Sequence, residues 1–340
     1  MFRNGFQKGI IKSTPLPGGG FLTITRANMR LGVGVIGLGR RWRHYRPLLA
    51  RLRKYVQVRA VCDQLLSRAE IEAQKWACAA AAGPVELLER PDVEAVLLLD
   101  AQWYGLWPLE HACHVRKPIL CALSPASDDA HADALHESIQ SSGLPVLMAL
   151  PPLLAPAARQ LRELLTHRLG QARLVRADWS IAGPTTRRPN PGDLLSKAAV
   201  LPLLAACAWL LDDIPRSVWT LDGASASFVT VLLRFGCDRL AQVNLWTATA
   251  GRTPPRLEVV AEAGTAAVQL PRQLRWRNAD GQYIQRLPPR VAEQSSLERF
   301  ILALRARQPL HPSFAEAYQA LTWLRAAVRS RNEGKCISLA

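Results

Sequence analysis

The residues with the clearest chemical role lie in the stretch from Leu31 to Asp63. An apolar run over 31–36 leads into the tight turn Gly37-Leu38-Gly39, and a second apolar run over 56–61 leads to Asp63. Gly37 lets the chain turn sharply, and Gly39 removes a Cβ where backbone would approach a pyrophosphate. Asp63 can accept a hydrogen bond from a ribose 2′-hydroxyl and would repel a 2′-phosphate. The turn and the carboxylate therefore predict a dinucleotide site that favours NAD over NADP.

A helix must follow the turn, and the residues at its start are mostly arginines. A helix running through Arg51 would point its free N–H groups and the positive end of its dipole at the phosphates, and Arg40 and Arg41 could clamp them. The third glycine of the G-x-G-x-x-G pattern is replaced by Trp42. Three outcomes stay open: the helix stands off the strand, it starts differently, or the indole ring fills space that the cofactor would use.

The elements that position this turn alternate along the first half of the chain. Apolar runs suited to buried parallel strands lie at 93–99, 118–121 and 144–150, with helices expected at 67–82, 84–90, 106–116 and 127–141. This alternation predicts a doubly wound parallel sheet over 31–150. Ligands bind such sheets beyond the carboxyl ends of the strands. That rule singles out 37–42, 63–64, 100–105 and 121–125, and with them Asp100 and Gln102.

The second half changes character at Pro151, Pro152 and Pro156. We expect helices at 156–167, 195–211, 294–307 and 313–329, and strands at 171–181, 218–221, 227–235, 239–247, 257–261 and 265–270, with a turn at Asp280-Gly281. Consecutive strands with one embedded helix predict an α+β domain with a mixed or antiparallel sheet over 151–340. Residues 1–30 look like a flexible arm, and Met29, near its end, is an alternative start.

Composition excludes several classes of protein. The 340 residues are 49% hydrophobic, enough for two cored domains, and no apolar run reaches the roughly 20 residues of a membrane span. Seven scattered cysteines without a C-x-x-C pair suggest reduced thiols in a cytoplasmic protein rather than a disulfide framework or a metal site. The net charge of +16 comes mainly from dispersed arginines, so nucleic-acid binding is a distant alternative.

Several motifs resemble the glucose–fructose oxidoreductase / inositol dehydrogenase / MocA (Gfo/Idh/MocA) family. The resemblance extends over about 31 to 330. An opening strand and turn match at 34–39, a D-x-E-A-V strand at 92–96 and a K-P-x-L-C strand at 117–121. A helix start matches at 156–159, and a W-L-L helix end followed by I-P matches at 209–215. The resemblance implies an NAD(P)-binding domain, a second domain that covers the cofactor, a sugar or polyol substrate and a homo-oligomer through the C-terminal sheet.

The resemblance also indicates which proton-handling residues this chain has exchanged. The position of the family's E-K-P lysine holds Leu123, and the histidine and aspartate of its H-x-x-D motif correspond to Pro202 and Ala205. Hydride transfer from an alcohol needs a base, and general catalysis contributes about 10²–10⁴-fold. No catalytic residue is therefore assigned by the resemblance.

Replacement groups and a second function remain open. Lys197, Asp178 and Asp193 are candidate bases, and Trp103 and Tyr104 are candidate pocket walls. His111 and His114 share a helix with Cys113, but no further metal ligand accompanies them. Two hypotheses follow: an oxidoreductase with an altered catalytic set, or a catalytically inactive relative that binds a sugar-like small molecule as a sensor, scaffold or partner subunit.

Overall fold

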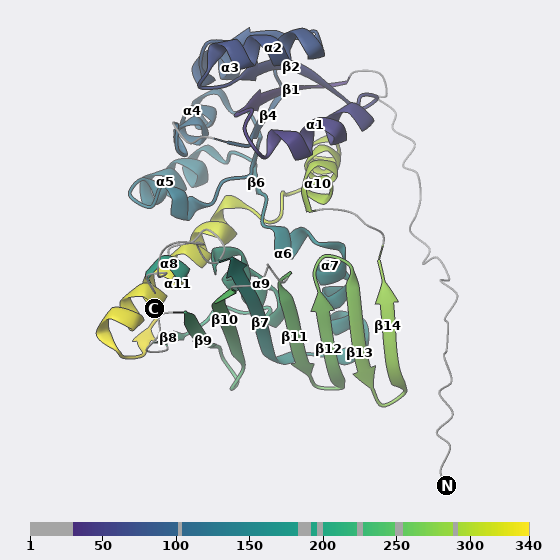
Figure 1. Ribbon diagram of the computed structural model, residues 1–340, viewed down its shortest axis with the longest axis vertical. Coiled ribbons are helices and arrows are strands. Elements are labelled where there is room, and N and C mark those ends of the chain that lie inside the picture. The colour runs from purple at the N-terminus through teal and green to yellow at the C-terminus, as the bar shows by residue number, and fades with distance from the viewer. Residues whose placement is uncertain are drawn as a thin grey trace.

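The computed structural model describes residues 30–100, 104–182, 192–195, 200–222, 227–248, 254–287 and 292–339. Within them the chain forms two sheets, one above the other in Figure 1. The first is entirely parallel with strand order β3-β2-β1-β4-β5-β6, the doubly wound order expected from the alternating pattern. Its strands are β1 (Leu31–Ile36), β2 (Val56–Cys62), β3 (Ala79–Ala81), β4 (Ala95–Leu98), β5 (Ile119–Cys121) and β6 (Val146–Met148).

Helices cover both faces of this sheet. Alternate side chains of β1 and β4 enter two separate apolar clusters, because successive residues of a strand point to opposite faces. One face packs against α1 (Trp42–Arg51) and α2 (Leu66–Trp76); the other packs against α3 (Pro84–Glu89), α4 (Trp107–Val115) and α5 (Ala132–Ser142), with a short 3₁₀ turn, η1 (Pro125–Ser127), before α5.

The expected helix over 67–82 was wrong in its second half. Helix α2 ends where Ala77 adopts a left-handed conformation with φ of +49°, and the alanines of β3 then pair with Ala60–Cys62 of β2. Alanine has a high helix propensity, so this short edge strand follows from its pairing with β2, which local sequence does not encode.

The second sheet has nine strands in the order β14-β13-β12-β11-β7-β10-β9-β8-β15. β7 and β10 are parallel and every other pair is antiparallel, so the sheet is mixed, as predicted. β13 and β14 were not among the expected strands, because polar and charged residues alternate through them at the edge of the sheet. The strands are β7 (Ala172–Ala182), β8 (Ser217–Asp222), β9 (Phe228–Arg234), β10 (Leu240–Ala248), β11 (Arg256–Ala261), β12 (Gly264–Gln269), β13 (Gln273–Asn278), β14 (Gly281–Arg286) and β15 (Ile337–Ser338).

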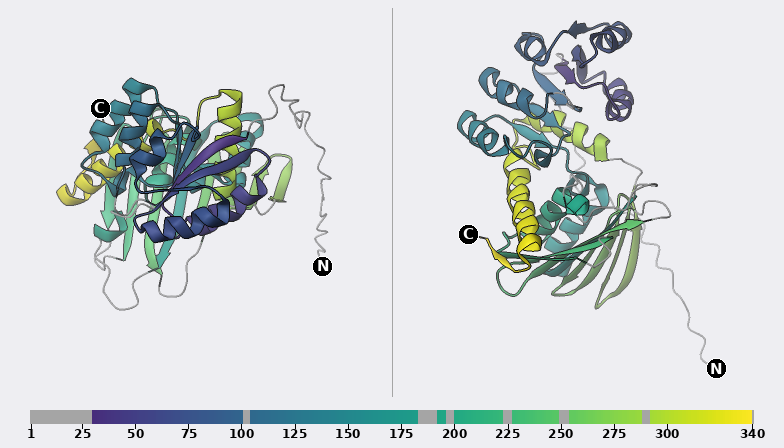
Figure 2. Two further views of the ribbon diagram at one scale, coloured as in Figure 1. Left: turned by 90° about the horizontal axis from the view of Figure 1, so that it is seen from above. Right: turned by 60° about the vertical axis from the view of Figure 1, so that its left-hand side comes forward.

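Helices line the inner face of the second sheet and connect it to the first. They are α6 (Pro151–Leu154), α7 (Pro156–Leu164) with a π-helical end, η2 (Leu165–Leu169), α8 (Gly192–Leu195), α9 (Val200–Leu211), α10 (Ala292–Ala306) and α11 (Phe314–Glu333). α10 lies beside α1 on the first sheet, and α11 runs from α5 across the second sheet, as both views in Figure 2 show. The last two helices therefore join the two sheets.

None of the helices in the described ranges combines the length and apolarity that crossing a membrane would require.

Candidate functional site

The glycine turn lies at the carboxyl end of β1, as predicted. Gly37 has φ of +91°, and its N–H donates to the carbonyl of Cys62, 2.8 Å away. A Cβ on Gly37 would overlap the backbone carbonyl of Asp100, so only glycine fits. A Cβ on Gly39 would overlap the Asp100 carboxylate and lie 3.1 Å from its Cγ. Asp100, just beyond the end of β4, therefore lies against both glycines.

The Asp63 carboxylate is held against the same turn. It is buried, with 6% of the residue exposed. Its Oδ2 accepts the Leu38 N–H at 2.8 Å, and its Oδ1 accepts the Leu65 N–H at 3.1 Å and an Arg68 N–H at 3.0 Å. The structure thus brings Leu38 and Asp63 together, with the carboxylate fixed where the two strands end.

The two arginines predicted to clamp phosphates face different spaces. Arg40 lines a surface hollow of about 400 Å³ with Leu38, Gly39, Arg43 and Arg68. Arg41 instead lines a larger cavity between the two sheets, and its Nη1 donates to the carbonyl of Leu99 at 3.3 Å. The first turn of α1 holds no acidic residue, so the positive end of the helix dipole and the arginines add together there.

Trp42 resolves one of the questions left open by the sequence. Helix α1 begins at this residue, and its indole is buried toward α2, where Nε1 donates to Glu72 at 3.1 Å and the ring packs 5.8 Å from that of Trp76. Burial alone would raise the pKa of Glu72, but hydrogen bonds from Lys75 and Trp42 lower it. The ring lines neither the arginine hollow nor the larger cavity.

The larger cavity, about 490 Å³, opens beyond the carboxyl ends of β5 and β6 and faces the second sheet. Leu123 follows β5 of the first sheet, Pro202 lies on α9, and both side chains line this cavity. Ala205 lies buried on α9, one turn beyond Pro202, and is not part of the wall. The remaining wall is largely proline, leucine and alanine: Ala122, Ala149, Leu150, Pro151, Pro152, Leu154, Ala155, Pro254, Pro255, Leu270 and Pro271, with Ser124 and Trp179.

Three ionisable side chains line this cavity within the described residues: Arg41, Tyr45 and Glu293. The Tyr45 hydroxyl lies 2.9 Å from Ser296 Oγ on α10, and burial raises the pKa of Tyr45 well above its ordinary value, so this phenol stays protonated. Sequence reasoning missed Tyr45 and Glu293. Tyr45 stands among the arginines at the start of the helix that follows the glycine turn. Glu293, in contrast, reaches the cavity only because α10 packs on α1.

Other candidates have different surroundings. Asp178 accepts hydrogen bonds from Arg176 at 2.9 Å and Asn244 at 2.7 Å and borders a separate hollow on the second sheet. The Tyr104 hydroxyl lies 3.9 Å from Cys62 Sγ, and burial raises the pKa of Tyr104 to about 12. Residues 1–28, Gln102, Trp103 and Lys197 lie outside the described residues, as does the side chain of Asp193.

The histidines of α4 are not joined by further metal ligands. His111 lies near Glu89, 3.4 Å away, and its ring stacks on Trp107. Across the described part of the chain, no three histidine, cysteine, aspartate or glutamate side chains form a group that could hold a metal ion.

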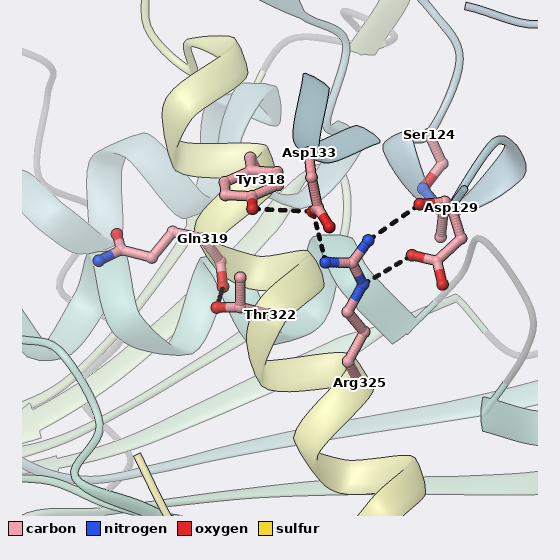
Figure 3. A network of polar contacts seen from close by, with 8 residues as sticks. Ser124, Asp129, Asp133, Tyr318, Gln319, Thr322 and Arg325 are labelled. Atoms are coloured by element: carbon pink, nitrogen blue, oxygen red, sulfur yellow. Dashed lines mark hydrogen bonds and ion pairs between the residues drawn. The ribbon is translucent and has the colours of Figure 1, made fainter. Parts of the chain in front are cut away.

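A polar network joins α11 to α5 and to the segment just before it (Figure 3). Arg325 on α11 donates to Asp133 Oδ1 at 2.6 Å and to Asp129 Oδ1 at 2.8 Å, and the Tyr318 hydroxyl donates to Asp133 at 2.8 Å. Because α5 packs on the first sheet and α11 on the second, these bonds link the two sheets.

Comparison with known proteins identifies the fold. No protein-family model matches the sequence, and no curated protein matches it. Solved structures do match over almost the whole chain: an NAD binding oxidoreductase from Klebsiella pneumoniae is 15% identical with a TM-score of 0.77, covering 92% of this chain and 100% of that one. The UDP-N-acetylglucosamine 3-dehydrogenase of Acidithiobacillus ferrooxidans is 19% identical, TM-score 0.74, covering 89% and 98%. The aldose-aldose oxidoreductase of Caulobacter crescentus, complexed with glycerol, is 14% identical, TM-score 0.74, covering 92% and 100%.

The chain has the Gfo/Idh/MocA oxidoreductase fold. The resemblance drawn from short motifs is confirmed at the level of the fold, since TM-scores of 0.74 to 0.77 extend over about nine-tenths of the chain. Leu123 follows β5, Pro202 lies on α9, and both line the larger cavity.

Proposed function

We propose that this protein is an NAD(P)-dependent oxidoreductase of the Gfo/Idh/MocA type with an altered catalytic set. The observation that carries the proposal is the glycine turn. Gly37 has a positive φ, Gly39 lines a surface hollow together with arginines, and Asp63 accepts the Leu38 N–H. A structural neighbour is described as an NAD binding oxidoreductase.

The residues around the turn fit a dinucleotide in most respects. Arg40, Arg43 and Arg68 supply positive charge beside Gly39, where phosphates bind at helix N-termini. Asp63 would hold the ribose and favours NAD over NADP, because its carboxylate would repel a 2′-phosphate. A nicotinamide, when bound, accepts or delivers a hydride. The Asp100 carboxylate against Gly39 is a group that opposes phosphate at this turn.

The interdomain cavity is where a small-molecule substrate would meet the cofactor. Leu123 and Pro202 cannot take a proton, Tyr45 is held protonated, and Arg41 is a permanent cation. Glu293 is therefore the group in the described wall that could accept a hydroxyl proton. The proposed substrate class, sugar or polyol, follows the resemblance; one neighbour is an aldose-aldose oxidoreductase and another a UDP-N-acetylglucosamine dehydrogenase.

A second function is favoured by the character of the same wall. Each buried sugar hydroxyl needs a hydrogen-bonding partner, and the described wall is mostly proline, leucine and alanine. This favours a catalytically inactive relative that binds a ligand as a sensor, scaffold or partner subunit. Turnover separates the two: the enzyme oxidises a sugar or polyol with NAD⁺, whereas the inactive relative binds but does not react.

Calorimetric titration with NAD⁺, NADH, NADP⁺ and NADPH tests the proposal. We expect binding of NAD⁺, and Gly39→Ala should weaken it roughly tenfold or more, because the added methyl stands where the pyrophosphate must approach the backbone. Gly83→Ala is the matched control, since its Cβ would meet no atom within 4 Å. Equal affinities for the two variants, or no binding of any of the four, would place the cofactor elsewhere or remove it from the function.

A further inference from the structure

Asp100 occupies the position from which a phosphate would approach the glycine turn. It lies two residues beyond the end of β4, and its carboxylate oxygen lies where a Cβ of Gly39 would stand. The second glycine of this motif is glycine so that a pyrophosphate can come close to the backbone. In this chain the space that the glycine leaves is filled by a carboxylate of the protein itself.

The surroundings of this carboxylate are those of an anion site. The amino end of α1 begins at Trp42 with no acidic residue in its first turn, and Arg40 and Arg43 line the hollow that Gly39 borders. Arg41 is bonded to the carbonyl of Leu99, the residue before Asp100. A helix N-terminus and arginines stabilise whichever anion is nearest, so the Asp100 carboxylate and a cofactor phosphate would draw on the same positive charge.

We propose that the Asp100 carboxylate opposes the cofactor pyrophosphate at the glycine turn and so sets the dinucleotide affinity. This rests on the proposed function, since it supposes that the turn is a cofactor site. The carboxylate lies beside Gly39, so its like charge opposes the phosphates when a dinucleotide arrives. Sequence reasoning placed Asp100 among the cofactor-binding residues; here it lies at that site and limits binding.

Removing this charge should strengthen cofactor binding. Asp100→Asn keeps the shape of the side chain, so the pyrophosphate no longer meets a like charge, and NAD⁺ should bind about tenfold more tightly.

The experiment is calorimetric titration of the wild-type protein, Asp100→Asn and Asp238→Asn with NAD⁺ and NADH, together with thermal unfolding without ligand. Asp238 is the control because its carboxylate is 97% exposed and asparagine tolerates its left-handed backbone, so the same charge is removed far from the turn. Tighter binding for Asp100→Asn alone, with a cooperative unfolding transition that shows the variant is folded, supports the inference.

The remaining outcomes separate the inference from the proposed function. If the wild-type protein binds NAD⁺ and Asp100→Asn binds no more tightly, the inference is overturned while the proposed function stands. If only Asp100→Asn binds, the inference is supported, and the wild-type protein is a relative whose cofactor site is blocked by its own Asp100. If neither variant binds NAD⁺ or NADH, both the inference and the proposed function are overturned.

Discussion

Glu293 is the residue on which turnover by this protein would depend. It lines the interdomain cavity with Leu123 and Pro202, whose side chains carry no proton-transfer group. We expect Glu293→Gln to lower kcat by about 10²–10⁴-fold, because the amide cannot accept the hydroxyl proton, while NAD⁺ affinity stays unchanged. Steady-state kinetics with calorimetry measure the two effects separately.

The control for Glu293 is Glu298→Gln, a carboxylate further along α10 that bonds Gln294 and does not line the cavity. A wild-type protein that binds NAD⁺ and turns over no sugar or polyol would assign the second function. Equal kcat for Glu293→Gln and the wild-type protein would show that the base is another group.

At the scale of elements, we expect the contact between α5 and α11 to weaken in acid. The ring of His136 stacks on Tyr318, with centroids 4.0 Å apart, and its Nδ1 is buried with no partner among the described residues. Burial lowers the pKa of His136, against the opposing charges of Glu137 and Asp133. The folded protein therefore favours the neutral ring, and α5 and α11 lose part of their mutual stabilisation when the ring is charged.

The sign of the pH dependence follows from that direction. Below about pH 6.5 the unfolded chain binds a proton at His136 more readily than the folded protein does, so stability falls as pH falls from there through the folded pKa. His136→Phe keeps the stacked ring. It should reduce the slope of the free energy of unfolding against pH over this range by up to about 1.4 kcal/mol per pH unit. Urea unfolding between pH 7 and pH 5 measures it; His114→Phe, an exposed ring on α4, is the control. The same slope in wild-type and His136→Phe protein would contradict the prediction.

At the scale of the whole molecule, the outer face of the second sheet carries exposed apolar side chains. The inner face of the sheet is covered by helices, while its outer face exposes Trp219 and Phe228, each 43% accessible, on the neighbouring strands β8 and β9. Large apolar groups gathered on one open face are typical of an interface. The expected homo-oligomer through the C-terminal sheet stays a prediction.

We expect light scattering to give the mass of an oligomer for the wild-type protein and of a monomer for the double variant Trp219→Glu with Phe228→Glu. Two buried charges at such an interface would have no partners, which abolishes association. Leu302→Glu, on α10 and 62% exposed, is the control and should not change the mass. An oligomer of unchanged mass in the double variant would place the interface elsewhere.

The sequence by itself determined the local features that depend on near neighbours. Apolar runs of fixed length predicted the parallel sheet, and the Gly37-Leu38-Gly39 turn with Asp63 predicted the end of the sheet where both now lie. The mixed second sheet followed from its turns and alternating strands. These predictions succeeded because periodicity and glycine conformation are properties of short segments.

Only the tertiary structure decided what depends on packing between distant segments. The burial of Trp42 against α2, the pairing of three alanines as β3, and the entry of Glu293 into the cavity all require partners far away in the sequence. The placement of Asp100 against Gly39 is of the same kind, because it depends on the register between β1 and β4. Side-chain surroundings are set by the whole fold, and so is the charge that a ligand would meet at this turn.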